Sequence, residues 1–392
     1  MGDLTGGPRG LGLLDSGRAA VRYAKHRGLQ RAARKLFRAF ILGRQRIYLT
    51  RSNQCEVAAL PLRTNGVEVR LARPNDPLVE AFPHLTISKI ATWLAPDHLM
   101  FVILCDGRLV GYRCVSTKVD PSVSGFLGLR PHQIYTVFMY TNPEHRQHGL
   151  TRITRIAVAR ELVKRGFREA WSAESPTNHN AVIATERKGP IRVGTLTRTS
   201  LLGRVGFSMT PVTTLSPQLI HRQLTQFKEI ARSAASVGLL FNPSVTIGVE
   251  GADALKSVAA ELGAELTLLP VRETADQTST FHEAFATALK QGVTGLIVLS
   301  DPMMKDHRRT IVALVNRYRL AALFDAKEFV AAGGLMACGT PAPCLRDFDS
   351  LLAYLDTMDA AGHPPEAGDE PELVVNRHTA AALGLVVPPT LR

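Results

Sequence analysis

The spacing of hydrophobic residues divides most of the chain into two regions. Between residues 67 and 209, apolar runs of strand length alternate irregularly with amphipathic segments, which is typical of a mixed sheet. Beyond residue 216, nearly continuous apolar strands alternate regularly with helices. Such strands are buried on both faces, and the alternation predicts right-handed crossovers. The expected fold class is α/β, with a mixed-sheet domain followed by a doubly wound parallel-sheet domain.

The same pattern places the individual elements. In the first region it predicts strands at residues 67–72, 100–105, 109–116, 133–141, 169–175, 191–197 and 202–209, and helices at 77–93, 151–165 and 180–188. Asp106 and Gly107 are expected to form a hairpin turn, and Gly166 is expected to end the second helix. In the second region it predicts strands at residues 236–241, 265–271, 295–300 and 320–324, helices at 218–235, 251–262, 280–291 and 305–319, and a last strand and helix within 372–385.

Residues 15–47 form a basic segment ahead of these regions. Apolar residues recur there at three- and four-residue spacing and predict an amphipathic helix, with basic residues on its other side. Such a helix can lie on an anionic membrane surface, follow phosphates or pack on the domain behind it. Its composition also suits an organellar transit peptide. We therefore divide the chain into an arm (residues 1–50), a first domain (51–214) and a second domain (215–392).

Composition excludes several classes of protein. The 392 residues are 45% hydrophobic and 21% charged, which is too apolar for a disordered chain. No run of about 18 uncharged apolar residues is present to span a membrane. The five cysteines form no Cys-x-x-Cys pair, so we expect reduced, buried thiols and no metal site. We expect no secretory signal peptide and a cytoplasmic location, with membrane-peripheral attachment through the arm as an alternative.

The charge is unevenly distributed along the chain. Its net value is +13, of which residues 1–50 contribute +9, whereas residues 216–392 contribute −5. A basic first half and an acidic last third indicate parts with different partners, and nucleic acid is not the expected one.

A candidate anion site lies between the strand at 133–141 and the helix at 151–165. The loop of residues 146–151 (RQHGLT) leads into that helix. The first backbone N–H groups of a helix have no partner within it, and the helix dipole favours negative charge there. Gly149 allows close approach of a ligand, and Arg146 and Arg152 add positive charge. The pattern is typical of a pyrophosphate cradle.

The order of elements over about residues 67–209 resembles the GNAT family of acyl-CoA-dependent N-acetyltransferases. Arg146-x-x-Gly149-x-Thr151 matches two of the three defined positions in the family's Arg/Gln-x-x-Gly-x-Gly/Ala motif. Residues 106–112 (DGRLVGY) are similar to its central hairpin, and Asn178-x-x-Ala181 followed by a glycine at 189 keeps its spacing. Thr151 replaces the small third residue of the motif.

The resemblance implies that acetyl-CoA is the acyl donor. It implies that backbone from Met139 to Thr141 bonds the pantetheine arm and that Asn178 lies beside the pantetheine end. The pyrophosphate would then be held by Arg146, Gln147, His148, Gly149, Leu150, Thr151 and Arg152.

Two departures concern the chemistry. The tyrosine that protonates the leaving thiolate in the family is Thr185 here, and the strand at 133–141 has no carboxylate. Glu174 is therefore the candidate general base, with His132 and Glu144 as alternatives.

Residues 215–387 resemble the ABC-transporter substrate-binding family, which has a type I periplasmic-binding-protein fold. The matching segments are residues 238–243 (GLLFNP), 295–302 (GLIVLSDP), 308–312 (RRTIV), 328–336 (EFVAAGGLM) and 372–385 (ELVVNRHTAAALGL). Such proteins close two lobes on a ligand, but only the second lobe and the return segment are recognisable here. One wall of a cleft buries too little of a small ligand to hold it alone.

The second domain nevertheless has candidate ligand residues at its strand ends. Asn242, Asp301 and Phe329 are placed there, and Asn242 and Asp301 serve equally well as turn and cap residues. The apolar side chains of Phe329, Leu335 and Met336 are expected to need a cover from the first domain or from the second subunit of a homodimer.

These observations favour an acyl-CoA-dependent N-acyltransferase that moves an acetyl group from acetyl-CoA to an amine. Its C-terminal domain would sense a small ligand, position the acceptor or dimerise. One alternative is a non-catalytic small-molecule binding protein in which both halves have lost their original chemistry. Another is a membrane- or nucleic-acid-attached regulator that acts through residues 15–47. The acceptor stays open among amino acids, sugar amines, peptides and antibiotic amines.

Overall fold

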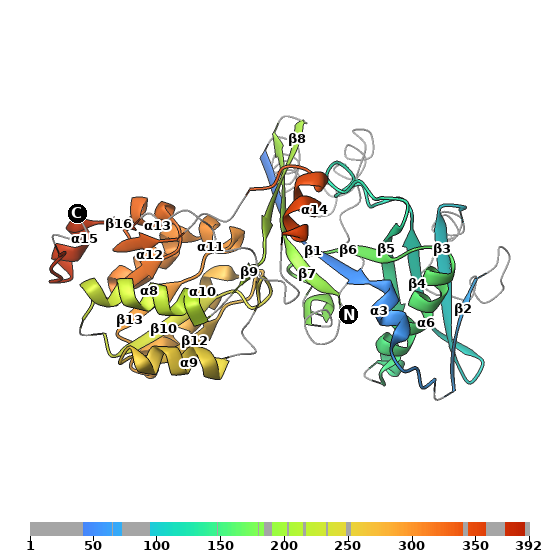
Figure 1. Ribbon diagram of the computed structural model, residues 1–392, viewed down its shortest axis with the longest axis horizontal. Coiled ribbons are helices and arrows are strands. Elements are labelled where there is room, and N and C mark those ends of the chain that lie inside the picture. The colour runs from blue at the N-terminus through green and yellow to red at the C-terminus, as the bar shows by residue number, and fades with distance from the viewer. Residues whose placement is uncertain are drawn as a thin grey trace, which may run out of the picture. The chain divides into compact units, whose positions relative to one another are not determined.

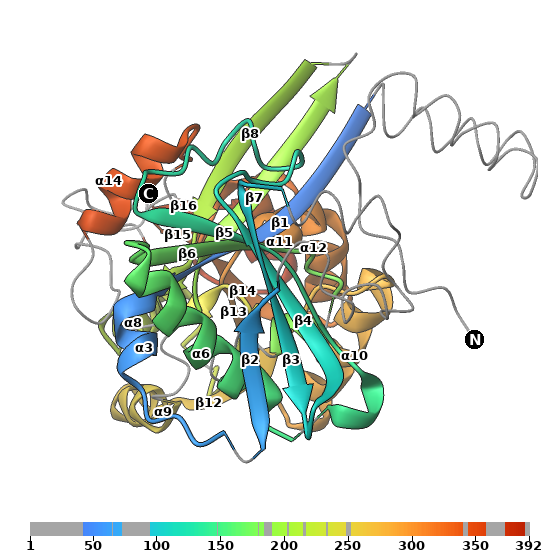
Figure 2. The ribbon, with the colours of Figure 1, turned by 90° about the vertical axis from the view of Figure 1, so that its right-hand side faces the viewer.

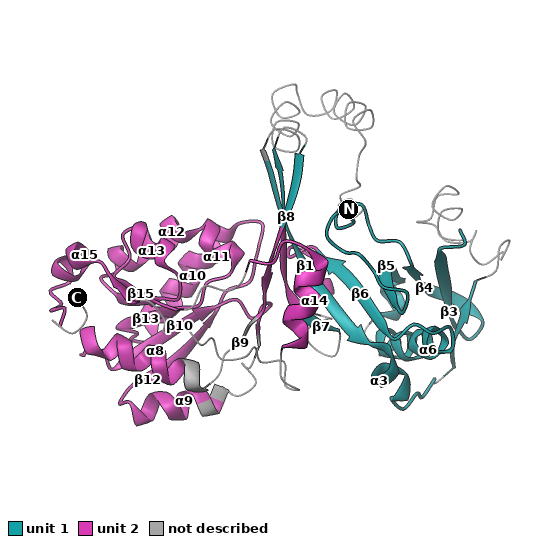
Figure 3. Cartoon of the chain, turned by 45° about the horizontal axis from the view of Figure 1, so that its top comes forward, with its two compact units in different colours: residues 1–174, 183–192, 198–207 teal, residues 175–182, 193–197, 208–392 magenta. Residues whose placement is uncertain are grey.

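The computed structural model describes residues 42–64, 66–72, 95–146, 148–178, 180–183, 190–201, 204–214, 217–232, 234–247, 252–339, 344–357 and 373–388 (Figure 1). The chain divides by its contacts into two compact units (Figure 3). Unit 1 comprises residues 1–174, 183–192 and 198–207, and unit 2 comprises residues 175–182, 193–197 and 208–392. The strand at 191–201 therefore contributes to both units, and the boundary predicted between residues 214 and 215 stays a prediction.

An eight-stranded sheet has the order β2-β3-β4-β5-β6-β1-β7-β8. Strands pair antiparallel from β2 to β5 and from β6 to β1, whereas β5 and β6 run parallel. This is the mixed sheet that the sequence predicts. The strands are β1 (Leu42–Asn53), β2 (Val67–Leu71), β3 (His98–Cys105), β4 (Arg108–Ser116), β5 (Gln133–Thr141), β6 (Glu169–Glu174), β7 (Ile191–Leu201) and β8 (Arg204–Pro211).

Strand β1 corrects part of the helix that the sequence predicts over residues 15–47. The predicted helix over 15–47 is wrong at residues 42–47, because these residues are the first part of β1, which pairs with β6 from Tyr48 onward. Ile47, Tyr48 and Leu49 are buried, and Thr50 beside them is fully buried as well. A short continuous apolar run of this kind is typical of an interior strand. The rest of the predicted arm lies outside the described residues.

The predicted hairpin turn is confirmed between β3 and β4. Asp106 and Gly107 have φ values of 49° and 75°. A two-residue turn with positive φ at both positions matches the twist of the strands it joins, and Asp-Gly is among the sequences that tolerate it.

Helix α6 (Leu150–Lys164) covers one face of the sheet in unit 1, as Figure 2 shows. Its Val158 and Leu162 pack with Phe101, Val115 and Ile134 from β3, β4 and β5. Gly166 ends the helix with a φ of 89°, as predicted. Two shorter helices complete the described part of this unit, α3 (Gln54–Ala59) and the 3-10 helix η2 (Pro143–His145). The helix predicted at residues 77–93 lies outside the described residues.

Unit 2 contains a six-stranded sheet of order β12-β10-β13-β14-β15-β16. Its strands are parallel except for β16, which is antiparallel to β15. The prediction of a parallel sheet alternating with helices is therefore confirmed. The strands are β10 (Ser236–Phe241), β12 (Glu265–Pro270), β13 (Gly295–Val298), β14 (Ala321–Phe324), β15 (Met336–Cys338) and β16 (Leu373–Val375), and a small separate sheet joins β9 (Thr213–Thr214) to β11 (Thr246–Ile247).

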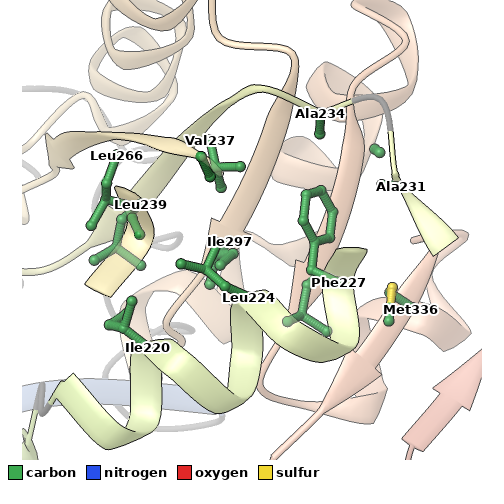
Figure 4. Close-up of a cluster of buried hydrophobic side chains, with 14 of the residues drawn as sticks. Ile220, Leu224, Phe227, Ala231, Ala234, Val237, Leu239, Leu266, Ile297 and Met336 are labelled. Carbon is green, nitrogen blue, oxygen red and sulfur yellow. The ribbon is translucent and has the colours of Figure 1, made fainter. Parts of the chain in front are cut away.

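Helices cover both faces of this sheet, as a doubly wound fold requires. Figure 4 shows one face, where Ile220, Leu224 and Phe227 of α8 meet Val237 and Ile297 of the sheet. The opposite face packs against α10, α11, α12 and α13. The helices are α8 (Pro217–Ile230), α9 (Ala252–Glu261), α10 (Gln277–Lys290), α11 (Pro302–Asp306), α12 (Arg308–Arg317), α13 (Lys327–Ala331), α14 (Phe348–Asp356) and α15 (Arg377–Ala382).

The apolar residues of the return segment need no cover from outside unit 2. Phe329, Leu335 and Met336 are fully buried within the two core clusters of that unit. The expectation of a cover by the first domain or by a second subunit is therefore wrong. No cover is needed, because the three side chains are already buried in the core of unit 2.

The cysteines only partly match expectation. All five are free thiols, but Cys114 and Cys338 alone are buried, whereas Cys344 is exposed. None of the helices in the described parts of the chain is long and apolar enough to cross a membrane. Location and arm attachment stay predictions.

Candidate functional site

The N-terminus of α6 is the centre of the site predicted in unit 1. Strand β5 ends at Thr141, η2 follows, and α6 begins at Leu150 with Gly149 as its N-cap. Gly149 has a φ of 76°, makes no side-chain cap and has no atom within 4 Å of the position that a Cβ would take. No acidic residue lies in the first turn. An uncapped helix N-terminus without nearby carboxylates attracts anions.

The residues around this N-terminus have different orientations. Arg146, His148 and Thr151 are exposed, as is Arg152. Arg146 is fixed by a hydrogen bond of 3.1 Å from its Nε to the carbonyl oxygen of Thr141. The side chain of Leu150 is buried against the sheet, so only its backbone can face a ligand. Gln147 lies outside the described residues.

Strands β5 and β6 part before β5 reaches the loop that leads to this helix N-terminus. Their ladder joins Gln133 to Glu169 and ends where Tyr135 pairs with Trp171, although both strands continue. The pairing of β5 with β4 skips Val137, which forms a bulge. A bulge bends and twists its strand, so β5 turns away from its parallel neighbour. Beyond this point, Phe138 and Met139 are 43% and 39% exposed.

The candidate base Glu174 is part of a buried ion pair. Its Oε2 lies 3.0 Å from Nη2 of Arg192, and the two side chains are only 13% and 7% exposed. The guanidinium of Arg192 also lies 4.3 Å from the ring centroid of Tyr48. The carboxylate of Glu174 is thus held by a cation, and its role as the base stays a prediction. The alternatives His132 and Glu144 are exposed.

Two other predicted residues stand apart. Asn178 caps the short helix that follows it, because its Oδ1 accepts from the backbone N–H of Ala181 at 3.4 Å. By its contacts it belongs to unit 2 rather than to unit 1, so its place beside the pantetheine stays a prediction. Thr185 lies outside the described residues.

Sequence reasoning missed a buried arginine in this region. Arg113 of β4 is only 9% exposed, and its Nη2 donates to Oγ1 of Thr136 over 3.1 Å. Burial, together with the nearby charge of Arg155, lowers the pKa of Arg113 to about 10. The strand pattern could not reveal this residue, because alternation assigns it a face of the sheet but not a depth.

In unit 2, two predicted residues meet at the carboxyl edge of the sheet. Asn242 and Asp301 are 1% and 6% exposed, and Nδ2 of Asn242 donates to Oδ2 of Asp301. Asp301 also caps α11 by accepting from the N–H of Met304 at 2.7 Å. Asn242 accepts from the N–H of Ser244 at 3.0 Å. These contacts fit the turn and cap roles, which the sequence left open.

Phe329 lies elsewhere. It is fully buried and stacks on Phe324 with 4.7 Å between ring centroids, which places it in the core of unit 2. No group of three His, Cys, Asp or Glu side chains that could hold a metal occurs in the described residues.

A second carboxylate at this edge was not predicted. Oδ2 of Asp325 accepts from the N–H of Ser300 at 2.8 Å, whereas its Oδ1 is buried without a hydrogen-bond partner. Burial raises the pKa of Asp325 from 3.8 to about 6. Because Asp325 directly follows β14, its position at the edge could have been found from the strand pattern, but its burial could not.

Two family models match the chain. The model described as ABC transporter substrate binding protein matches residues 158–391, and the Acetyltransferase (GNAT) family model matches residues 69–189. Both resemblances stated from the sequence are confirmed by these matches. No curated protein matches the chain.

The chain is also similar to several solved structures. The ABC domain from Streptococcus pneumoniae in complex with L-Trp is 19% identical over 46% of this chain and 60% of its own, with a TM-score of 0.35. A conserved domain protein from Vibrio cholerae is 20% identical over the same shares, with a TM-score of 0.34. AAC(6′)-Iy in complex with a bisubstrate analogue is 18% identical over 31% of this chain and 87% of its own, with a TM-score of 0.25. This chain spans 60% of the length of the first two structures.

Proposed function

Starting from the fact that this chain belongs to the ABC transporter substrate binding protein family and carries a GNAT acetyltransferase domain, we propose that unit 1 transfers an acetyl group from acetyl-CoA to an amine. One observation carries the proposal. The uncapped, acid-free N-terminus of α6 follows, after η2 and a short loop, a strand that has parted from its parallel neighbour. An anion site beside an open strand edge suits a carrier with a pyrophosphate and an extended, amide-containing arm.

The proposed binding mode follows the direction of β5. The pyrophosphate would meet the backbone amides of residues 147–152 and the guanidinium groups of Arg146 and Arg152. The arm would then run back along Thr141 and Met139, where added-strand hydrogen bonds can form. The thioester would lie toward Tyr135, at the closed end of the opening.

The proposed reaction is a direct attack of the amine nitrogen on the thioester carbon. The new C–N bond replaces the C–S bond, the amine loses one proton, and the thiolate takes one up. Glu174 is the proposed acceptor of that proton, directly or through a water. Its ion pair with Arg192 keeps the carboxylate charged, as a base requires, but competes for its Oε2.

A second candidate function is acyl-CoA or small-molecule binding without transfer. The same ion pair favours it, because a carboxylate held by a cation is a hindered base. In either case unit 2 is proposed to sense a small ligand, position the acceptor or dimerise. Its polar edge at Asn242, Asp301 and Asp325 supports the first of these roles, because the first two residues and Oδ1 of the third are buried.

Calorimetric titration of the full chain with acetyl-CoA tests the proposal. Arg146→Ala should weaken binding about tenfold, because it removes a charge-assisted contact worth about 1.4 kcal/mol. Arg160→Ala is the matched control. Arg160 lies on the same helix but donates to the carbonyls of Ala58 and Leu60, so acetyl-CoA binding should not change.

The outcomes separate the two candidate functions. Absence of binding at millimolar acetyl-CoA by the folded chain contradicts both acyl-CoA functions. Binding without thiol release over a panel of amines supports the non-catalytic function. Thiol release that depends on both substrates supports acetyl transfer.

A further inference from the structure

The side chain of Arg113 lies on the α6 side of the unit 1 sheet. Its neighbour two positions on, Val115, packs with Val158 and Leu162 of α6. The alternate residues Tyr112 and Cys114 pack with Met100 on the other face. The charged group of Arg113 is therefore enclosed between the sheet and the helix instead of reaching solvent.

Arg113 has too few partners for a charge in this position. Nη2 of Arg113 donates to Oγ1 of Thr136, but Nε of Arg113 is buried and has no acceptor. No carboxylate of the described residues forms an ion pair with it, and the charge of Arg155, which acts on its pKa, has the same sign. Burying an unpaired guanidinium costs several kcal/mol, so such groups are normally matched by an anion. The anion that completes this site is missing from the chain's own side chains in the described region.

The location of Arg113 indicates where that anion comes from. Its partner Thr136 is the first residue of β5 beyond the last rung of the β5–β6 ladder. From there β5 runs to Thr141 and the loop that leads to α6. Through its hydrogen bond to Thr136, the guanidinium of Arg113 thus lies beside the closed end of the opening, while β5 continues from there toward the N-terminus of α6. With the pyrophosphate at α6, the acyl group reaches the closed end.

We propose that unit 1 takes an acyl-CoA whose acyl chain ends in a carboxylate, such as malonyl-CoA or succinyl-CoA, and that Arg113 binds that carboxylate. The inference rests on the acyl-CoA binding of the proposed function, because it needs acyl-CoA in the opening, and it replaces the acetyl group of that proposal by a longer acyl group that carries a carboxylate. The reacting atoms are unchanged: C–N replaces C–S, and the distal carboxylate takes no part in the bond exchange. Arg113 with Thr136 then selects the acyl chain rather than catalysing its transfer.

Calorimetric titration of the full chain with acetyl-, malonyl- and succinyl-CoA tests this selection. The wild-type chain should bind one of the two dicarboxylic thioesters at least tenfold more tightly than acetyl-CoA. Arg113→Met should abolish that ratio by weakening only the dicarboxylic thioester, and Arg113→Lys should reduce it. Arg160→Met controls for the loss of a guanidinium elsewhere in unit 1 and should keep the ratio. Arg146→Ala should weaken all three thioesters equally.

Several outcomes overturn the inference. Equal affinities of the wild-type chain for all three thioesters contradict the inference, even if Arg113→Met fails to fold. An unchanged ratio between the affinities for the dicarboxylic thioester and for acetyl-CoA in folded Arg113→Lys contradicts it as well. A carboxylate on the acceptor could also reach Arg113, so turnover with acetyl-CoA is compared for amines with and without a carboxylate. If Arg113→Lys raises KM only for the carboxylate-bearing amines, the acyl-chain assignment is wrong. Failure of all three thioesters to bind contradicts the proposed function itself.

Discussion

Asp325 is a residue whose charged carboxylate lowers the stability of the folded chain. Its Oδ1 has no hydrogen-bond partner, and burial raises its pKa to about 6. Between pH 3.8 and 6 the folded chain therefore binds more protons at this carboxyl than the unfolded chain does. The free energy of unfolding must fall as the pH rises through that window. A residue with this cost at the carboxyl edge of a parallel sheet fits a ligand-facing role.

Asp325→Asn should remove the cost of that charge. The asparagine is close in shape to the protonated acid, so the variant and the wild-type chain should be equally stable at pH 4. Above pH 7 the variant should be more stable, by about 3 kcal/mol for a shift of this size. Thermal unfolding of unit 2, followed in the wild-type chain and in the variant across pH 4–8, measures the stability difference at both ends of this range.

Asp347→Asn is the control for this prediction. Asp347 caps α14 by accepting from the N–H of Ser350 at 2.8 Å, and that backbone contact lowers the pKa of its carboxyl. Here the charge is favoured by folding, so its removal should not raise stability at neutral pH. A stability of Asp325→Asn below the wild-type value at pH 7–8 would contradict the argument.

Single residues were predictable from the sequence where local backbone geometry decides their role. Asp106, Gly107, Gly149 and Gly166 all have the positive φ that their places in turns and caps demand. Arg113 was not predictable, because its burial depends on how α6 packs on β4. Phe329 was placed at a ligand edge by the strand pattern, but stacking on Phe324 draws it into the core.

At the scale of elements, α6 joins the packing of unit 1 to its proposed chemistry. Its buried face fixes the helix on the sheet, and its N-terminus is left without a capping side chain. The glycines at its two ends provide a matched pair. Gly149 and Gly166 have φ values of 76° and 89°, and at both a Cβ atom would meet no other atom within 4 Å.

Gly149→Ala and Gly166→Ala should therefore cost similar stability, about 1 kcal/mol from left-handed strain alone. Only Gly149→Ala should weaken acetyl-CoA binding, by tenfold or more, because its methyl group would occupy the space through which a ligand approaches the backbone amides. Thermal unfolding and calorimetric titration of both variants measure the two effects. Equal binding by the two variants would show that no ligand approaches Gly149 closely.

Element prediction failed where tertiary contacts override a local pattern. Residues 42–47 continue a helical spacing but form part of β1, whose Tyr48 pairs with Glu174. The predicted helix at 305–319 is two helices, α11 and α12, which meet at His307. β15 has only three residues, too few for a periodicity to show. The long apolar strands of unit 2 were found because burial on both faces leaves a continuous signal.

At the scale of the whole molecule, the chain is two compact units that share β7. The sequence shows the change of pattern near residue 216 but not the contact by which Leu345 pairs with Met209 of β8. Both residues belong to unit 2. They lie far apart in sequence, so no local pattern reports their pairing.

A substitution in the core of unit 2 tests whether acetyl-CoA binding by unit 1 depends on the stability of unit 2. Gly295 of β13 is packed so tightly that an added Cβ would lie 2.6 Å from Cζ of Phe227. Gly295→Ala should therefore destabilise unit 2 by about 1–3 kcal/mol through overpacking against α8. If the acetyl-CoA site is formed by unit 1 alone, calorimetric titration at a temperature below unfolding should give unchanged acetyl-CoA binding.

Gly128→Ala is the control, because a Cβ atom at this position would meet no atom within 4 Å. It should change neither the stability nor the acetyl-CoA binding. Loss of acetyl-CoA binding in folded Gly295→Ala would instead show that the acyl-CoA site is organised by unit 2, since the substituted residue lies in that unit's sheet.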